Sequence, residues 1–182
     1  MRFSIPKLGT GSLLFIAALT LAERAGSQAQ QKLDDAAILA VAEFAHTAEL
    51  ETGQLAQENG SAQEVKDLGR NFVTAHTQAR TEARALGSRL NLSPRLATGD
   101  PMARAHSEAM TRLRGLEGKA FDKAYIDHEV TFHQALIEKV KTSLIPAATS
   151  AEVKAYLNKL TPSLQAHLEE ARALQTKIVA AN

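Results

Sequence analysis

From residue 31 onward, apolar residues recur three or four positions apart, a spacing that places them on one face of an α-helix. Alanine, leucine, glutamate, lysine, glutamine and arginine are the commonest residues in this part of the chain, and all six favour helices. No run of four or more residues alternates apolar and polar side chains with β-branched enrichment, which would indicate a strand. The pattern therefore predicts an all-α protein.

Breaks in the pattern divide this region into four long helices and a short one. Loop-forming residues cluster over 92–100, and Gly115 and Gly118 bracket a turn. Pro146 is expected to end the third long helix, whereas Pro162 falls inside the fourth and is expected to kink it. The long helices are expected at about 34–58, 62–91, 119–142 and 151–178, and the short helix at about 101–114.

Local signals mark the ends of several of these helices. Asn59 and Gly60 both tolerate the left-handed conformation that often closes a helix, so the first helix is expected to end there. Ser61, with Glu64 three residues later, has the spacing of a capping box and predicts the start of the second helix. Asp100 is followed by proline, which predicts the N-cap of the short helix.

The two pairs of long helices resemble each other. Glu64-Val65-Lys66 opens the second long helix and Glu152-Val153-Lys154 opens the fourth, and each is followed by a histidine, His76 and His167. A duplicated helical hairpin is one route to an antiparallel four-helix bundle. We therefore expect such a bundle, with the short helix in the connection between the second and third long helices.

The first residues of the chain have the pattern of a secretory signal peptide. Arg2 and Lys7 supply positive charge, and an apolar run follows over 12–22. This run is too short to cross a bilayer, since a spanning helix needs roughly twenty residues. Ser27 and Ala29 then provide the small residues that a signal peptidase requires. An uncleaved membrane anchor is the alternative interpretation.

Cleavage after Ala29 would leave a signal peptide, 1–29, and a single domain, 30–182, with no membrane-spanning segment in the mature chain. Cysteine is absent, which excludes a lipid-modified N-terminal cysteine, a disulfide scaffold, a thiol nucleophile and a cysteine-ligated metal. We therefore expect an exported protein, located in the periplasm if the cell is Gram-negative.

Charge and aromatic content narrow the expected partners. The 21 basic and 20 acidic residues give a net charge of +1, and aromatic residues make up only 4% of the chain. These values support neither a basic surface nor an aromatic stacking platform, so nucleic acid is not an expected partner. The chain also has no glycine-rich phosphate loop and no serine in a nucleophile elbow.

Residue types that bind metals fall on the predicted inward faces of all four long helices. Because residues three or four apart share a helix face, Glu43 with His46, and Glu129 with His133, could each act on one ion. Neutral imidazoles and carboxylates suit a divalent metal such as zinc or iron. The candidate metal ligands are Glu43, His46, Glu49, His76, Glu129, His133 and His167.

Two points bear on this candidate site. Counted from the Asn59-Gly60 turn at about 1.5 Å per residue, Glu43 and His46 are expected to lie nearer to His76 than Glu49 does. In the alternative interpretation, the inward histidines hydrogen-bond to neighbours such as Glu49 or Tyr125 and only specify the packing of the helices.

A set of short motifs spread over about 36–176 also carries information: Ala48–Ala56, Glu64–Lys66, His76-Thr77, Leu113–Leu116, Gly118, Phe121-Asp122, Tyr125, His133, Leu160–Leu164 and His167-Leu168. With these motifs the sequence resembles a known family, the bacterial domain of unknown function 4142 family. The resemblance implies a ferritin-like helical bundle that is exported and has no established reaction.

By this resemblance, four of the candidate ligands match recurring polar positions of the family. The family usually has an aspartate directly before the histidines of its second and third long helices, but this chain has Ala75 and Phe132 there. A site that relies on those acids is therefore expected to be weak. The four matching residues are Glu49, His76, His133 and His167.

Three functions remain open at this point. The first is an exported helical-bundle protein that binds metal weakly or serves the response to envelope stress. The second is a ferritin-like, metal-dependent oxidase, which the sequence disfavours because only Glu43 and His46 have the Glu-x-x-His spacing of a di-iron site. The third is an interaction module for an envelope protein, which an exposed apolar patch near Met102, Met110 and Leu113 would favour.

Overall fold

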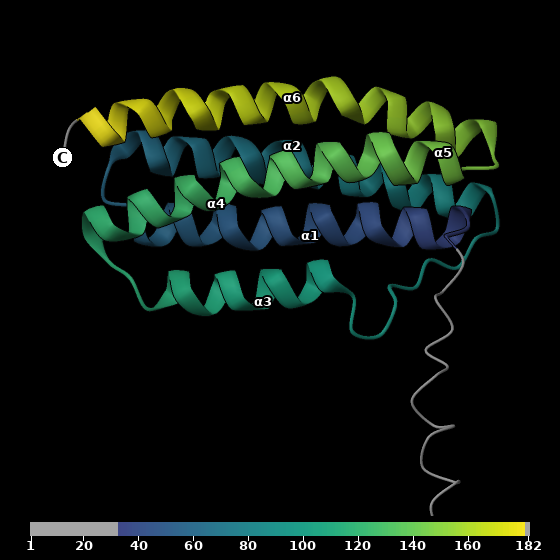
Figure 1. Cartoon of the computed structure of the whole chain (residues 1–182), viewed down its shortest axis with the longest axis horizontal. Coiled ribbons are helices and arrows are strands. Elements are labelled where there is room, and N and C mark those ends of the chain that lie inside the picture. The colour runs from purple at the N-terminus through teal and green to yellow at the C-terminus, as the bar shows by residue number, and fades with distance from the viewer. Residues whose placement is uncertain (1–32, 181–182) are drawn as a thin grey trace, which may run out of the picture. The chain divides into compact units, whose positions relative to one another are not determined.

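The computed structural model describes residues 33–180, and every element of regular structure in that range is helical (Figure 1). The expected signal peptide, 1–29, lies outside the described residues. The helices are α1 (Asp35–Asn59), α2 (Gln63–Arg89), α3 (Pro101–Arg114), α4 (Gly118–Lys139), the π-helical turn η1 (Val140–Leu144), α5 (Ile145–Ala147) and α6 (Ala151–Ala180).

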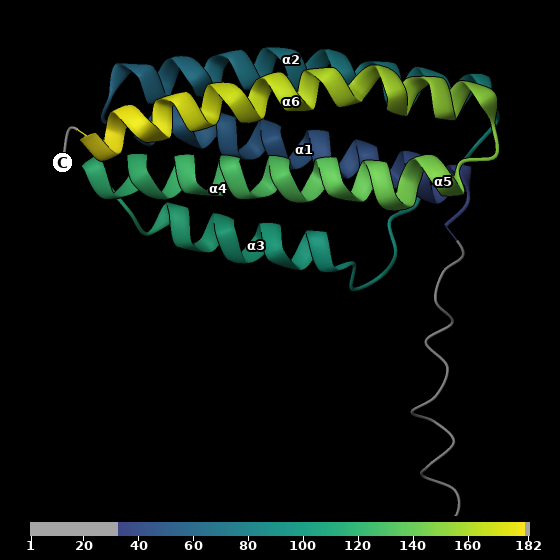
Figure 2. The same ribbon diagram turned by 45° about the horizontal axis from the view of Figure 1, so that its top comes forward.

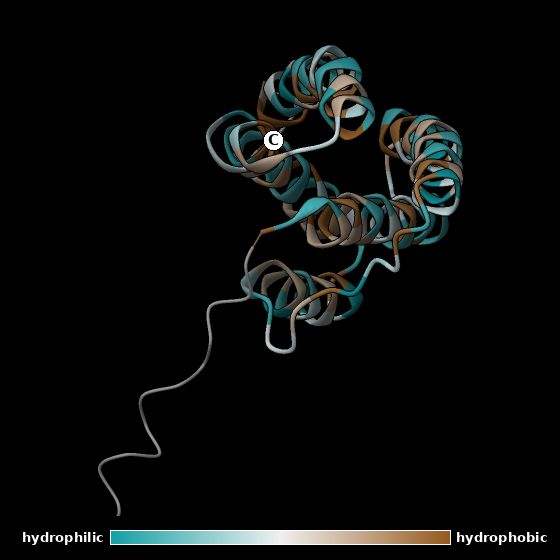
Figure 3. Ribbon diagram, turned by 90° about the vertical axis from the view of Figure 1, so that its right-hand side faces the viewer, coloured by the Kyte–Doolittle hydropathy of each residue, from teal (hydrophilic) through white to brown (hydrophobic). Residues whose placement is uncertain are grey.

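Helices α1, α2, α4 and α6 run alongside one another, and short turns connect α1 to α2 and α5 to α6 (Figures 1 and 2). Seen along the helix axes, α3 lies outside the group of long helices, and it contacts α1 and α4 (Figure 3). The predicted all-α bundle, with a short helix in the connection between the second and third long helices, is confirmed.

Several helix ends are capped by their own neighbours in sequence, among them the cap predicted at Asp100. The Asp34 carboxylate accepts a hydrogen bond from the Ala37 amide at 2.9 Å, and the Asp100 carboxylate accepts one from the Met102 amide at 2.8 Å. The Ser150 hydroxyl accepts hydrogen bonds from two amides in the first turn of α6. These caps satisfy backbone donors that have no partner within the helix.

The predicted cap of α2 is wrong. The N-cap residue is Ala62 rather than Ser61, and the side chain of Glu64 forms no capping box with it. Instead, the carboxylate of Asp122 on α4 accepts hydrogen bonds from the amides of Ser61 and Ala62, at 2.7 and 2.8 Å. A distant residue therefore satisfies the free amides at this end, which local sequence signals do not reveal.

The start of α6 is held in a similar way. The carboxylate of Asp35 on α1 accepts hydrogen bonds from the amides of Thr149 and Ser150, both at 2.9 Å. The first helix of each hairpin thus carries an aspartate, Asp35 or Asp122, that binds the start of the second helix of the other hairpin. These contacts fix the two hairpins against each other along the helix axes.

Helices α1 and α2 approach most closely at Gly53 and Gly69. A Cβ atom on Gly69 would lie 2.6 Å from the carbonyl oxygen of Gly53, so only glycine allows this approach. Gly60 adopts φ −55° rather than the left-handed conformation expected for it. It is required for space, because a Cβ atom there would lie 2.5 Å from the carbonyl oxygen of Ala56.

The ends of the later helices differ from the prediction. Helix α4 ends at Lys139 and continues through the wider turn η1 into α5, which contains Pro146. Proline has no amide to donate to the preceding turn, so a regular helix cannot continue unchanged there. Helix α6 is a single helix that includes Pro162.

Two apolar clusters occupy the two ends of the bundle, and polar residues lie between them along each long helix. Phe72, Phe121, Leu136 and Leu164 are buried, whereas Phe132 and Leu160 are only partly buried. One cluster includes Ile38, Leu86, Leu136, Leu144, Leu157 and Leu164, and the other includes Leu55, Val65, Phe72, Leu113, Phe121 and Tyr125. The polar layer between them contains five of the predicted metal ligands, Glu49, His76, Glu129, His133 and His167.

Candidate metal-binding site

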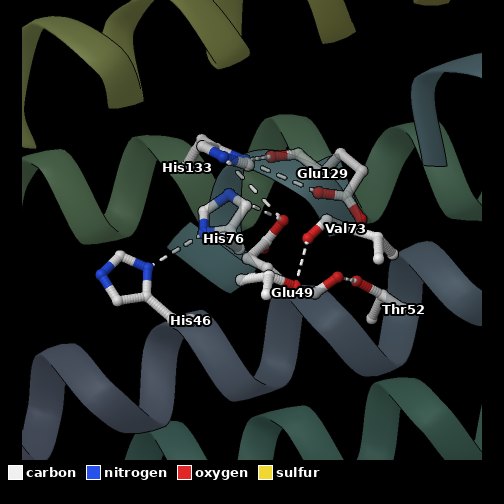
Figure 4. A network of polar contacts seen from close by, with 8 residues as sticks. His46, Glu49, Thr52, Val73, His76, Glu129 and His133 are labelled. Atoms are coloured by element: carbon white, nitrogen blue, oxygen red, sulfur yellow. Dashed lines mark hydrogen bonds and ion pairs between the residues drawn. The ribbon is translucent and has the colours of Figure 1, made fainter. Parts of the chain in front are cut away.

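Polar side chains from all four long helices meet between the two apolar clusters. Glu49 comes from α1, His76 from α2, Glu129 and His133 from α4, and His167 from α6. Figure 4 shows the first four of these side chains pointing toward one another. Each of those four is at most 2% exposed, and His167 is partly buried. We call these five residues the central cluster.

The central cluster contains two overlapping groups whose ligand atoms all lie within 4.8 Å of one another. One group is His76, His133 and His167, and the other is Glu49, Glu129 and His133. Glu49 Oε2 lies 3.8 Å from His76 Nε2 and 3.9 Å from His133 Nε2. Glu129 Oε2 lies 3.6 Å from His133 Nδ1. His133 therefore belongs to both groups.

Most of the polar atoms that face the middle of the central cluster have no hydrogen-bond partner within the protein. Buried polar groups are nearly always hydrogen-bonded, because leaving one unpaired in a low-dielectric interior costs about 1–3 kcal/mol. A concentration of such atoms in one place therefore requires an explanation. The atoms are both carboxylate oxygens of Glu49 and of Glu129, Nε2 of His76 and of His133, and Nδ1 of His167.

The tautomer of His133 follows from its backbone partner. His133 Nδ1 lies 3.0 Å from the carbonyl oxygen of Glu129, one turn earlier in α4. A carbonyl can only accept, so Nδ1 carries the proton and donates it. Nε2 of His133 consequently presents its lone pair to the central cluster, which is the state required of a metal-binding imidazole.

The direction of helical side chains explains why Glu49 reaches His76. Side chains lean toward the N-terminus of their helix, so Glu49 leans away from the α1–α2 turn, whereas His76 leans toward it. The two side chains converge, although His46 is closer to His76 in height. The expectation that Glu43 lies nearer to His76 than Glu49 does is wrong, because counting the helix rise ignores this lean.

The structure does not bring Glu43 into the central cluster. Its carboxylate pairs with the guanidinium of Arg84, whose side chain is 57% exposed. His46, in contrast, lies directly behind the cluster, with Nδ1 3.0 Å from Nδ1 of His76 and Nε2 2.9 Å from the hydroxyl of Tyr156. Glu43 and His46 therefore do not act together on one ion.

Burial sets the ionisation of these groups. It lowers the pKa of His133 to about 3 and that of His46 to about 4, and it lowers the pKa of His76 well below the ordinary value. It raises the pKa of Glu129 to about 7 and, together with the neighbouring Glu129 carboxylate, raises that of Glu49. At neutral pH the imidazoles are therefore neutral, and their lone pairs are available.

The rings of the central cluster pack around Phe72. The Phe72 ring centroid lies 4.7 Å from that of His167 and 5.3 Å from that of His133. The ring centroids of His76 and His167 are 5.0 Å apart. Phe72 is fully buried, so one wall of the central cluster is apolar. An apolar wall lowers the local dielectric and strengthens electrostatic interactions with any bound ion.

A cavity of about 210 Å³ connects the central cluster with the surface between α2 and α6. The ion pair of Glu82 and Lys159, 2.8 Å long, crosses from α2 to α6 beside it, and both side chains are exposed. Small side chains leave this space open, since bulkier ones would fill it. The lining includes His76, His167, Tyr156, Ala75, Ala79 and Ser163.

The sequence did not indicate the role of Tyr156. It lies on the apolar face of α6, and its contact with His46 depends on how α1 and α6 pack together. Two further histidines lie outside the central cluster. His106 is buried, and its Nε2 lies 2.8 Å from a carboxylate oxygen of Glu51. His128 lies near it, so these two histidines belong to the contact between α3 and the bundle.

Solved structures with the same fold are known, although their sequences are distant. A Streptomyces coelicolor protein, described as "putative secreted protein DUF305", has a TM-score of 0.67 at 15% identity and aligns over 79% of this chain and 93% of its own. CopM in a Cu(II)-bound form has a TM-score of 0.60 at 14% identity, covering 79% of this chain and 98% of CopM. An Ag-bound form of CopM gives the same TM-score and identity.

These likenesses show a shared helical fold and nothing more. No curated protein is significantly similar to the chain in sequence. A family model, in contrast, matches residues 20–174, which include the whole central cluster. The chain therefore belongs to the family described as "Domain of unknown function (DUF4142)".

Proposed function

We propose that this chain is an exported protein whose central cluster binds one divalent transition-metal ion. The ligands would be one imidazole nitrogen each from His76, His133 and His167, with a carboxylate oxygen of Glu49. The observation that carries the proposal is the convergence of unpaired, buried nitrogen and oxygen atoms from four helices. A bound cation would give the three imidazole nitrogens and one Glu49 oxygen a partner, which the protein itself does not provide.

The donor atoms indicate the class of metal. Imidazole and carboxylate suit zinc, copper(II) and iron, whereas thiolate and thioether suit copper(I) and silver. The chain has no cysteine, and its described methionines, Met102 and Met110, lie on α3, outside the central cluster. Zinc and copper(II) are therefore the ions of choice. The Cu(II)-bound form of the structurally similar CopM is consistent with such an ion in this fold.

A purely structural role explains the central cluster less well. Polar residues that only specify packing form hydrogen-bonded networks, because a half-satisfied network is less stable than an apolar core. His46 and Tyr156 form such a pair, but no carboxylate oxygen of Glu49 or Glu129 has a partner within hydrogen-bond geometry. Such an arrangement destabilises the metal-free protein, and a bound cation would offset this loss of stability.

A ferritin-like oxidase has less support. A di-iron site of that type takes carboxylates from all four helices and a Glu-x-x-His pair from two of them. In the described cluster, carboxylates come only from α1 and α4, and α2 and α6 contribute histidine alone. Glu43, the one residue with the required spacing, is paired with Arg84 instead.

The interaction-module alternative also lacks the surface that would favour it. Met110 and Leu113 are buried, and Met102 packs against the apolar core. Within residues 33–180, Val179 is the single large hydrophobic side chain that is exposed. The short helix α3 therefore presents no apolar patch for a partner.

Export is part of the proposal. It is supported by the signal-peptide pattern of residues 1–29 and by the fold shared with a protein described as secreted. None of the helices in the described residues has both the length and the apolar character needed to cross a membrane. Mass spectrometry of the mature protein should find Gln30 at its N-terminus, and a mature chain that begins at Met1 would contradict export by cleavage.

Metal analysis of the protein, purified from its native envelope without a polyhistidine tag, is the direct test. We expect close to one equivalent of zinc or copper per chain. Added zinc should also raise the melting temperature of the metal-free protein, because an ion that binds only the folded state stabilises it by mass action. His133→Ala should abolish the rise.

The matched control is His106→Ala, which removes a buried histidine outside the central cluster. This variant should keep the full response to zinc, even if its own melting temperature is lower. A wild-type protein that contains no metal and whose melting temperature does not respond to zinc or copper(II) would contradict the proposal. Loss of the response in both variants would show that the effect is not specific to the central cluster.

A further inference from the structure

His76 can serve the central cluster only through Nε2, and only if that nitrogen is unprotonated. Its other ring nitrogen, Nδ1, is directed away from the cluster and lies 3.0 Å from Nδ1 of His46 (Figure 4). Nε2 lies 3.8 Å from Glu49 Oε2 and has no hydrogen-bond partner. A neutral imidazole carries one proton, so the position of that proton decides whether Nε2 offers a lone pair or an N–H group.

A chain of hydrogen bonds links His76 to α6. His46 Nδ1 faces His76 Nδ1, and His46 Nε2 lies 2.9 Å from the hydroxyl oxygen of Tyr156. The Tyr156 hydroxyl in turn donates to the backbone carbonyl of Ala79 on α2, at 3.5 Å. His46 is 1% exposed and Tyr156 is 8% exposed, so packing holds both side chains in place.

Two proton arrangements satisfy this chain while both rings stay neutral. In the first, Tyr156 donates to Ala79, His46 donates from Nε2 to Tyr156, and His76 donates from Nδ1 to His46, which leaves the lone pair on His76 Nε2. In the second, Tyr156 donates to His46, His46 donates from Nδ1 to His76, and the proton of His76 lies on Nε2. Only the first arrangement leaves His76 able to bind a metal.

We infer that Tyr156 and His46 are positioning residues that hold His76 in the tautomer with its proton on Nδ1 and its lone pair on Nε2. The inference rests on the proposed function for its purpose, but the tautomer itself is a property of the metal-free protein.

The Ala79 carbonyl, 3.5 Å from the Tyr156 hydroxyl, favours the first arrangement because it offers that proton an acceptor other than His46. A carbonyl only accepts, and the Tyr156 hydroxyl has one proton. When that proton is donated to Ala79, the hydroxyl oxygen can only accept from His46 Nε2, and the remaining protons follow in order. The second arrangement gives up the contact with Ala79 and places an N–H group of His76 where no acceptor lies within hydrogen-bond distance.

The chain also explains why His46 faces the back of His76 and contributes no atom to the central cluster. Metal-binding histidines generally donate their second ring nitrogen to a partner that fixes the tautomer and the orientation of the ring. His133 uses the Glu129 carbonyl for this purpose, and His76 uses His46. The two ligands are therefore oriented by different means, one local to α4 and one that requires α1, α2 and α6.

The direct test is ¹⁵N NMR of metal-free protein labelled at histidine, with His76 assigned by its absence in His76→Gln. We expect the ¹⁵N shifts of a protonated Nδ1 and an unprotonated Nε2 in the wild type. A wild-type His76 protonated on Nε2 would overturn the inference. This result does not depend on whether the protein binds metal.

Tyr156→Phe tests the origin of the tautomer. Phenylalanine cannot accept from His46, so His46 should move its proton to Nδ1 and drive the proton of His76 to Nε2. The zinc affinity should fall roughly 10–100-fold, as is typical when a partner of a metal-binding histidine is lost. His46→Ala should lower the affinity as well. His46→Gln should retain more of it, because an amide can both accept from His76 and donate to Tyr156.

Lys159→Met is the matched control, because Lys159 lines the same cavity but takes no part in the hydrogen-bond chain. It should leave the tautomer and the zinc affinity unchanged. If wild-type protein binds zinc and Tyr156→Phe binds it equally well with an unchanged His76 tautomer, the inference fails while the proposed function stands. If wild-type protein binds no metal but shows the expected tautomer, the proposed function fails and the inference about Tyr156 and His46 stands.

Discussion

Helix α2 makes two very different contacts with its neighbours. Against α1, Gly69 and Gly53 bring the two backbones so close that a Cβ atom on Gly69 would lie 2.6 Å from a carbonyl oxygen. Against α6, the small side chains of Ala75 and Ala79 leave a cavity of about 210 Å³, and an ion pair between exposed side chains crosses it. One contact leaves no free space, and the other leaves a channel to the surface.

This difference indicates how the central cluster combines rigidity with access. Glu49 lies on the tightly packed side, where the glycine contact fixes α1 and α2 in register, and His76 reaches toward it from α2 while also lining the cavity. His167, the one partly exposed member of the cluster, lies on α6 beside the cavity. A buried site needs both a fixed ligand set and a path for the ion. The two faces of α2 supply these separately.

The largest expected loss of stability comes from shortening a buried side chain beside the cavity between α2 and α6. Leu164 is 2% exposed and lines the cavity, so Leu164→Ala should lower the free energy of unfolding by about 2–5 kcal/mol, measured by urea denaturation. Leu160→Ala on the same helix should cost less, because Leu160 is only partly buried. A loss below about 0.5 kcal/mol for Leu164→Ala would show that the packing of α6 described here is wrong.

The close contact between α1 and α2 should be destabilised by the addition of a single methyl group. Gly69→Ala adds a Cβ atom against the backbone of α1 and should cost about 1–3 kcal/mol. Gly87→Ala, the same change in the same helix, meets its nearest atom at 3.5 Å and should stabilise by about 0.5–1 kcal/mol. Thermal unfolding of both variants measures the contrast, and equal effects would argue against a close contact between α1 and α2.

The pH dependence of stability tests the buried carboxylate of Glu129 in the central cluster. The pKa of Glu129 is about 7 in the folded protein, above its ordinary value near 4.5, so the metal-free protein should lose stability as pH rises between these values. Glu129→Gln cannot ionise and should be more stable than the wild type at pH 8, on the order of 1–3 kcal/mol, in the absence of metal.

Two further measurements, on a Glu82→Gln variant and on the zinc-bound protein, test this interpretation of Glu129. Glu82→Gln removes an exposed carboxylate whose pKa is lowered by its contact with Lys159, so it should bring no gain at pH 8. Bound zinc should reduce the difference, because a cation held beside Glu129 stabilises its ionised carboxylate, which the glutamine variant lacks. A Glu129→Gln variant that is no more stable than the wild type at pH 8 would show that this carboxylate is not destabilised by burial.

The smallest effect on stability is expected from narrowing the channel. Ser163 is exposed and lines the cavity, so Ser163→Phe should change the free energy of unfolding by less than about 0.5 kcal/mol. It should nevertheless slow the uptake of zinc several-fold, measured by competition with a chromophoric chelator, without changing the final affinity. Gln165→Phe, an exposed site on α6 outside the cavity, is the control. Equal uptake rates would show that the ion enters elsewhere.

The sequence by itself determined the features that depend on neighbouring residues. Helical periodicity predicted the all-α fold, and the caps at Asp34, Asp100 and Ser150 were predictable because each acts on amides two or three residues away. The same periodicity placed Glu49, His76, His133 and His167 on inward faces, since a helix converts sequence spacing directly into a direction around its axis.

Only the tertiary structure decided the features that join residues distant in sequence. Asp122 caps α2 across 60 residues, and Gly53 and Gly69 set the register of α1 against α2. That register, and the lean of the side chains, bring Glu49 to His76 and place His46 behind it. Periodicity specifies which face of a helix a side chain occupies. It does not specify how far along the bundle that side chain lies or which residue of another helix it contacts. The position of the proton on His76 depends on both.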